Sequence, residues 1–285
     1  MRLGVAELIA GLAMCAVLQA SDLAKQRSVL DRDRDAARLE AASISIAASG
    51  DSAALADLAK HLGSRAFLHR LDPARGSVPE VVHLGEVFRS LTLHPSLATA
   101  SLCIALAANS EFTAVPARLN FLLNALAAVR PMEEPAAKIF RTASRSGFLE
   151  VNGPLLAGNA SPRSLGVLSE LFKDESLDVA QRVSIAHWGL LPNRTNPDVV
   201  AMCARLLSAG GISHEVELAI LESLYDYRAR QWFGLAAGQP TPPPWSAASP
   251  AARDALKSLA AERLSRSDLP PALRAAIQNT LVQLR

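Results

Sequence analysis

Histidine and carboxylate side chains are the groups in this chain that could support a metal site or acid–base catalysis. The six histidines are spread along the sequence, and neither an HExxH pattern nor a CxxC pair occurs. His83 and Glu86 are three residues apart, so one helix could present both, but a metal ion needs at least a third ligand. We interpret them as a solvated polar pair. No catalytic residue, metal site or cofactor is predicted from these groups.

Two other kinds of residue could carry chemistry but have simpler explanations. Cys103 and Cys203 lie in apolar helical patterns, where a free cysteine behaves as a small hydrophobic residue. Asn120 and Asn124 are one helical turn apart and could bind a ligand or a neighbouring helix pair. Paired polar residues on a helix are commonly solvated, and this is the interpretation we favour.

The stretch from Tyr225 to Trp245, YDYRARQWFGLAAGQPTPPPW, concentrates residue types that dominate protein interfaces. It contains both tyrosines and two of the three tryptophans, Trp232 and Trp245. Tyr, Trp and Arg carry much of the binding energy at interfaces, so both tryptophans are candidate partner-binding residues. The alternative, which we favour, is that their rings pack over neighbouring helices, because large exposed rings would form an apolar patch that soluble monomers usually avoid.

The elements that position these residues are expected to be helices. Half of the 285 residues are apolar, but only 5% are aromatic, and strong helix formers such as Ala, Leu, Arg and Glu dominate long stretches. Alternating β-branched runs are nearly absent, so the predicted fold class is all-α. The 29 basic and 27 acidic residues are interspersed. The chain therefore lacks the concentrated basic surface that nucleic-acid binding requires.

Residues 1–20, MRLGVAELIAGLAMCAVLQA, form an apolar segment of their own. It could be a signal peptide cleaved after Ala20, an uncleaved membrane anchor, or the first buried helix of a soluble protein. Glu7 opposes the two membrane interpretations, although its place near the start of the segment lets it lie at the membrane interface. We favour export or anchoring, which predicts the cell envelope or periplasm; the cytoplasm is the alternative.

An internal repeat organises much of the remaining chain. Residues 163–191 and 197–227 align at an offset of 35, so that the apolar positions Leu165, Leu168 and Leu171 fall on Val200, Cys203 and Leu206. Each copy is predicted to form two helices with one buried stripe. An earlier copy is predicted at residues 81–109, and further helix pairs at 117–129 with 134–145 and at 250–264 with 269–284. The excess residues at 228–249 indicate an insertion.

Helix pairs that recur every 35 to 40 residues, with an apolar residue at the turn between them, resemble HEAT repeats. Asp178 and Arg182 approximate the family's Asp and Arg positions in one copy, whereas His214 and Leu218 stand there in the next. The resemblance covers roughly residues 50–285. It implies that residues 21–285 form a right-handed α-solenoid of stacked helix pairs; an irregular helical bundle is the alternative.

What the resemblance implies about function is a non-catalytic scaffold that binds a protein partner. In such solenoids the second helices of successive pairs usually line the concave face. The candidate partner-binding residues on those helices are Arg182, Glu217, Glu222, Arg274 and Gln278. Two alternatives stay open: an enzyme with a dispersed active site in the groove, and a structural protein of the cell envelope tethered to the membrane through residues 1–20.

Overall fold

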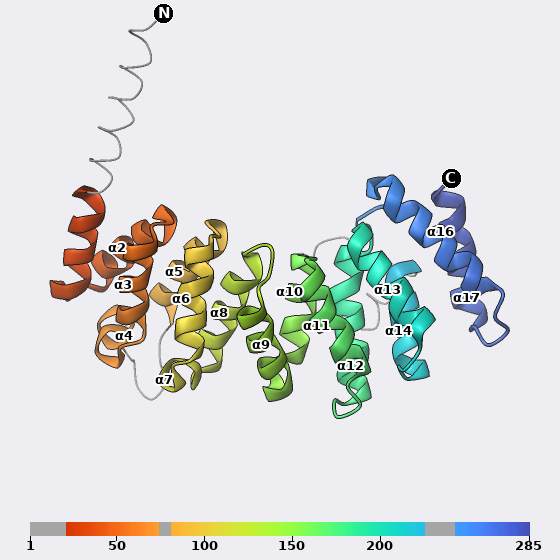
Figure 1. Ribbon diagram of the computed structural model, residues 1–285, viewed down its shortest axis with the longest axis horizontal. Helices are drawn as coiled ribbons and strands as arrows, with labels where there is room; N and C mark the ends of the chain where they lie inside the picture. Colours follow the sequence, from red (N-terminus) through yellow and green to blue (C-terminus); the bar gives the residue numbers. More distant parts are fainter. Residues whose placement is uncertain (1–20, 74–80, 226–242) are drawn as a thin grey trace, which may run out of the picture. The chain divides into compact units, whose positions relative to one another are not determined.

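The computed structural model describes residues 21–73, 81–225 and 243–285, and their regular structure is entirely helical (Figure 1). The prediction of an all-α chain is therefore confirmed for these residues. Their contacts group the chain into two compact units, Met1–Val129 and Arg130–Arg285. Each unit has its own buried core.

The first unit is built from two sets of helices that pack on each other. Residues 21–32 are helical and precede these sets. The first set has three helices: α2 (Ala36–Ser49) packs against α5 (Val82–Leu93), and α5 packs against α8 (Pro116–Ala128). The other set is α3 (Ser52–Leu62) and α6 (Leu97–Ala107), with the short helices α4 (Arg65–Leu71) and α7 (Ser110–Thr113) after them.

Phenylalanine side chains form the centre of this unit. The Phe88 ring, fully buried, has its centroid 5.9 Å from that of Phe112 and 6.3 Å from that of Phe121. Helix α5 begins where the buried carboxylate of Asp72 accepts hydrogen bonds from the backbone nitrogens of His83 (3.0 Å) and Leu84 (2.9 Å). Asp72 thus satisfies helix-terminal donors that would otherwise lack a partner.

The second unit contains two rows of helices. The first row is α9 (Glu134–Ala143), α11 (Pro162–Lys173), α13 (Pro197–Ala209) and α16 (Pro250–Leu264). The second row is α10 (Leu149–Asn159), α12 (Val179–Ile185) with the π-helical turn η2 (Ala186–Leu190), α14 (His214–Tyr225) and α17 (Pro271–Gln283). Short turns connect them: η1 (Ser144–Phe148), η3 (Leu191–Asn193) and η4 (Trp245–Ala247).

Local sequence signals account for the start of several of these helices. Helices α11, α13, α16 and α17 each begin at a proline, whose fixed φ suits the first helical position and whose missing N–H costs nothing there. The predicted helix pairs at residues 163–191 and 197–227 correspond to α11 with α12–η2 and to α13 with α14. Their predicted apolar stripe is buried, from Leu165 through Leu206.

Helices α10 and α12–η2 approach so closely that two positions require glycine. A Cβ added to Gly189 would lie 2.9 Å from the backbone of Gly153, and one added to Gly153 would lie 2.8 Å from Cβ of Ile185. Both distances are too short for any side chain. The backbones of the two elements are therefore in direct contact, which brings the second row of the unit together.

Candidate functional site

Arg182 and Arg274, two of the predicted partner-binding residues, close the ends of first-row helices. Nη1 of the buried Arg182 donates to the carbonyl of Phe172 (3.2 Å) in the last turn of α11. Nη1 of Arg274 donates in the same way to the carbonyl of Leu264 (2.8 Å), the last residue of α16. Each arginine lies ten residues after its acceptor. Because terminal helix carbonyls lack intrahelical partners, both guanidinium groups have a structural role.

The two predicted glutamates also make contacts inside the unit. Oε1 of Glu217 accepts hydrogen bonds from Nη1 of Arg263 and from Nη1 of Arg266, each at 2.6 Å. Arg263 is almost completely buried, so the Glu217 carboxylate compensates its charge. Glu222 lies 3.2 Å from Nε2 of the buried His187. These pairs link α14 to α16 and to η2.

The remaining predicted residues occupy different environments. Gln278 is exposed on α17, and Trp232 lies outside the described residues. Trp245 is only 6% exposed, and the guanidinium of Arg194 lies 4.0 Å from its ring centroid. Nε and Nη2 of Arg194 also donate to the carbonyl of Pro243, at 3.1 and 2.8 Å. The favoured interpretation of Trp245, packing within the fold, agrees with this burial.

The polar pairs considered from the sequence have partners of their own. His83 Nδ1 contacts the carboxylate of Glu40, while Glu86 pairs with Arg89 at 3.4 Å. Nδ2 of Asn124 donates to the backbone carbonyl and side-chain oxygen of Asn120, at 2.8 and 3.0 Å. Each of these side chains is thus engaged by residues of its own unit.

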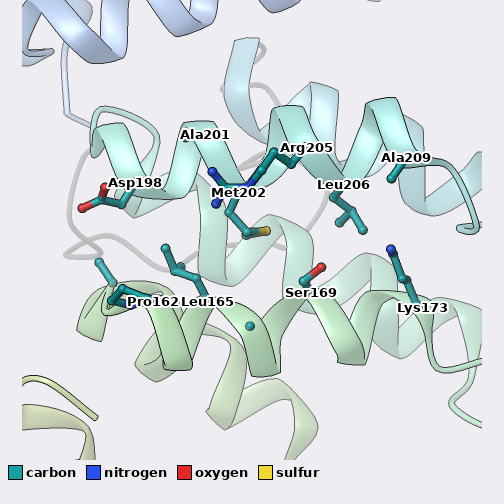
Figure 2. Close-up of a pocket in the computed structure, with 12 residues that line it drawn as sticks. Pro162, Leu165, Ser169, Lys173, Asp198, Ala201, Met202, Arg205, Leu206 and Ala209 are labelled. Carbon is teal, nitrogen blue, oxygen red and sulfur yellow. The ribbon is translucent and has the colours of Figure 1, made fainter.

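A groove between α11 and α13 on the second unit is large enough to hold another molecule (Figure 2). Its volume is about 530 Å³. The lining residues from α11 and the segment before it are Ala160, Pro162, Leu165, Gly166, Ser169 and Lys173. Those from α13 are Asp198, Ala201, Met202, Arg205, Leu206 and Ala209.

Small side chains in the middle of both helices explain why the groove is open. Gly166, Ser169 and Ala201 stand where longer side chains would fill the space between the helices. A Cβ built on Gly166 would meet no atom within 4 Å. The buried side chains of Met202 and Leu206 lie beneath these small residues and give the groove an apolar floor.

Charged side chains stand at the two ends of this groove. In Figure 2, Asp198 lies at the end marked by Pro162, whereas Lys173 lies at the end marked by Ala209. Lys173, Arg205 and Asp198 are exposed, and within the described part of the chain none of them forms an ion pair. The groove therefore has an acidic end and a basic end with charges available to a ligand.

The acidic residues beside Lys173 are engaged elsewhere. Glu170 accepts a hydrogen bond from Nε of Arg141 at 2.7 Å, and Asp174 pairs with Arg145 at 2.8 Å. Hydrogen bonds from the Ser176 hydroxyl and from Arg145 hold the pKa of Asp174 below its ordinary value. Asp174 therefore stays ionised and bound to Arg145, and neither Glu170 nor Asp174 pairs with Lys173.

The first unit contains a groove of the same construction between α3 and α6, with a volume of about 600 Å³. Its lining residues from α6 and the segment after it are Ala98, Ser101, Leu102, Ala105, Leu106 and Asn109, which stand 100 positions before the six lining residues of α13. On the opposite wall, formed by α3 and the residue after it, Ser52, Ala56, Ala59 and Gly63 stand 110 positions before Pro162, Gly166, Ser169 and Lys173.

The same register extends to the buried side of these helices. Cys103 in α6 and Cys203 in α13 occupy equivalent positions, and both are fully buried, as expected from the sequence. The alignment from the sequence instead places the copy at 81–109 eighty residues before 163–191, which matches α6 to α12. The shared groove matches α6 to α13.

The two grooves differ in the state of their polar groups. In the first unit, Lys60 pairs with Asp57 at 3.1 Å. Nδ2 of Asn109 donates to the carbonyl of Gly63 (2.8 Å), and its Oδ1 accepts from the backbone nitrogen of Phe112 (3.1 Å). Lys60 and Asn109 are thus satisfied internally, whereas the charges of the α11–α13 groove are not.

Sequence reasoning did not identify the α11–α13 groove because no motif marks it. The resemblance to HEAT repeats implied that the second helix of each pair carries the binding residues. This groove instead lies between α11 and α13, which are the first helices of two successive pairs. The available signal was the set of small residues at surface positions of those helices, such as Gly166 and Ser169. That signal becomes specific only when two such helices are known to be neighbours.

Three further findings concern metal sites, membrane-spanning helices and similarity to known proteins. Across residues 21–73, 81–225 and 243–285, no three His, Cys, Asp or Glu side chains are grouped so that they could hold a metal ion. Among the helices of these ranges, none has the length and apolar character needed to span a bilayer. Comparison with known protein families, curated proteins and solved structures finds no match to this chain.

Proposed function

We propose that this chain is a helical-repeat scaffold, built from HEAT-like helix pairs, that binds a protein partner in the α11–α13 groove. The observation that carries the proposal is that both units have a groove lined by residues at corresponding positions. Ser52 and Ala98 in the first unit correspond to Pro162 and Asp198 in the second. Repetition of lateral helix packing is the basis of α-solenoids. A right-handed solenoid is the arrangement that we propose for the helix pairs.

The repeated arginine cap supports the same architecture. Arg182 and Arg274 each reach back ten residues to the carbonyls of Phe172 and Leu264, at the turns within two different helix pairs. Equivalent contacts at equivalent turns are expected of repeated units that share a common packing.

The dimensions of the α11–α13 groove suit a short segment of a protein. Pro162 and Lys173 are eleven residues apart in α11, which corresponds to about 16 Å along the helix axis. An extended chain advances about 3.3 Å per residue, so about five residues would occupy this length. The volume of about 530 Å³ lies within the range of roughly 300–1,000 Å³ that is usual for ligand pockets.

Filling the groove tests this proposal. Gly166→Trp places a large ring into the open space at Gly166, whereas Gly166→Ala adds one methyl group and leaves most of the groove empty. A photo-cross-linking amino acid at the exposed Ala209, at the end of the groove, would capture a bound partner in cells for identification. We expect a discrete cross-linked protein with the unmodified groove and with Gly166→Ala, and its loss with Gly166→Trp.

The purified partner then provides a quantitative test. Its affinity for the Gly166→Trp chain should be at least about tenfold weaker than for the Gly166→Ala chain, a difference of about 1.4 kcal/mol. Both chains should have the same far-UV circular dichroism. Equal affinity of the partner for the two folded chains would refute the groove as the binding site.

Residues 1–20 bear on where such a scaffold would act. They lie outside the described residues, and export or anchoring through them stays a prediction. Amino-terminal sequencing of the native protein from separated envelope and soluble fractions would test it. An intact Met1 in the soluble cytoplasmic fraction would contradict export.

A further inference from the structure

We propose that the partner segment bound in the α11–α13 groove is acidic, with carboxylates that pair with Lys173 and Arg205. This inference rests on the proposed scaffold function and specifies the chemistry of its partner. It follows from the charges of the groove, from their positions, and from the contrast with the groove of the first unit.

The groove offers two cations without internal partners, Lys173 at one end and Arg205 above Met202. Lys173 and Arg205 are exposed, and no carboxylate of the described residues pairs with either of them. Two acidic residues close to Lys173 in the sequence, Glu170 and Asp174, are bound to Arg141 and Arg145. A ligand carboxylate could therefore pair with two cations that form no ion pair within the described residues.

The two cations come from opposite walls of the groove. Figure 2 shows the Lys173 amine directed from α11 toward α13, and the Arg205 side chain extending along α13 above Met202. A segment lying between the helices would pass both groups. Arg205 provides a planar fork that can bind a carboxylate through two hydrogen bonds, and Lys173 provides a compact charge that adjusts to the position of its partner.

Asp198 makes one end of the groove acidic, opposite to the end at which Lys173 lies. It stands about eleven residues, or about 16 Å, from the Lys173 end along the helix axes. A carboxylate placed beside Asp198 would be repelled, whereas a cationic or neutral residue would not. The acidic residues of the bound segment are thus expected beside Lys173 and Arg205 rather than beside Asp198.

The α3–α6 groove supplies a comparison within the same chain. It has a similar volume and the same register, yet its one lysine, Lys60, is paired with Asp57. Asn109, which lines the groove near Gly63, is hydrogen-bonded within the first unit. Similar shape with different available charge predicts that an acidic segment selects the α11–α13 groove.

Charge reversal in the full chain tests the inference. The probes are two fluorescein-labelled peptides of equal length, one of alternating Glu and Ala and one of alternating Lys and Ala, with binding followed by fluorescence anisotropy. We expect the unmodified chain to prefer the acidic peptide, and the Lys173→Glu, Arg205→Glu chain to prefer the basic one. The milder Lys173→Gln, Arg205→Gln chain should bind the acidic peptide about tenfold more weakly, since each exposed ion pair contributes up to several-fold.

A matched control separates the groove from the net charge of the protein. Arg65 and Lys138 are exposed, form no ion pair in the described ranges, and lie outside both grooves. The Arg65→Glu, Lys138→Glu chain has the same formal charge as the reversed groove variant and should retain the preference for the acidic peptide. Equal loss in this control and in the groove variant would overturn the inference.

The remaining outcomes distinguish this inference from the scaffold proposal. If Gly166→Trp abolishes binding of the cross-linked partner while charge reversal leaves it unchanged, the scaffold proposal stands and the acidic assignment is wrong. If neither change affects that partner, both are wrong. If inorganic polyphosphate or vesicles rich in phosphatidylserine bind at Lys173 and Arg205 while the acidic peptide does not, the ligand is another anion and the inference is overturned.

Discussion

Replacement of Trp245 by Ala is expected to destabilise the second unit strongly. The Trp245 side chain is 6% exposed, and the guanidinium of Arg194 lies 4.0 Å from its ring centroid. Removal of a buried Trp or Phe side chain commonly costs about 3–5 kcal/mol. The cation–π contact with Arg194 accounts for about 1 kcal/mol of this figure, because the contact is partly shielded from water. Since Trp245 lies in a short turn that can relax, we expect a loss of about 3 kcal/mol.

Urea denaturation followed by far-UV circular dichroism would measure this loss. For a unit of this size, about 3 kcal/mol corresponds to a decrease in Tm of about 6–12 °C. Leu93→Ala is the control, because Leu93 is 67% exposed and its truncation should cost less than about 0.5 kcal/mol. A double-mutant cycle with Arg194→Ala should give a coupling energy of about 1 kcal/mol. If Trp245→Ala is as stable as the unmodified chain, the Trp245 ring does not pack as described.

Three further predictions follow from burial and close contact. Arg182→Ala should lower stability by about 1–3 kcal/mol in urea denaturation, because it leaves the buried carbonyl of Phe172 without its donor; unchanged stability would contradict the capping role. Burial raises the pKa of Cys203 to about 12, so its thiol should react with a thiol reagent only after denaturant is added, and rapid reaction of the native chain would be evidence against this environment. Gly166→Ala should stabilise the second unit by up to about 1 kcal/mol, because its Cβ enters open space. Gly153→Ala should destabilise the unit, because its Cβ would lie 2.8 Å from a side-chain carbon of α12. Calorimetric melting of both variants would show whether their effects have opposite signs.

Much of the helical framework could be predicted from local signals. Helix α16 spans Pro250–Leu264, as predicted, because Ser249 caps its amino terminus and Pro250 suits the first turn. The apolar spacing also predicted which faces are buried, including Leu168, Cys203 and Tyr225. These features depend on interactions within one helix or between adjacent helices, which are encoded over a few residues.

The sequence repeat was less informative about which helices are equivalent. An apolar stripe identifies the buried face of a helix but does not say which neighbour covers it. The offset of 80 residues between the copies at 81–109 and 163–191 satisfied the apolar pattern, yet the grooves relate α6 to α13 through an offset of 100. This equivalence appears only when the lateral neighbours of each helix are known.

The sequence by itself thus determined the helical class, several helix starts and the buried stripes, because capping and apolar periodicity act over short distances along the chain. Tertiary structure decided the roles of the long polar side chains. Arg182 reaches a carbonyl ten residues away, and Glu217 joins an arginine of another helix. The packed helices also decided that Lys173 and Arg205 face one groove without internal partners. A long flexible side chain reaches groups on several neighbouring elements, so its partner is selected only when those elements are in place.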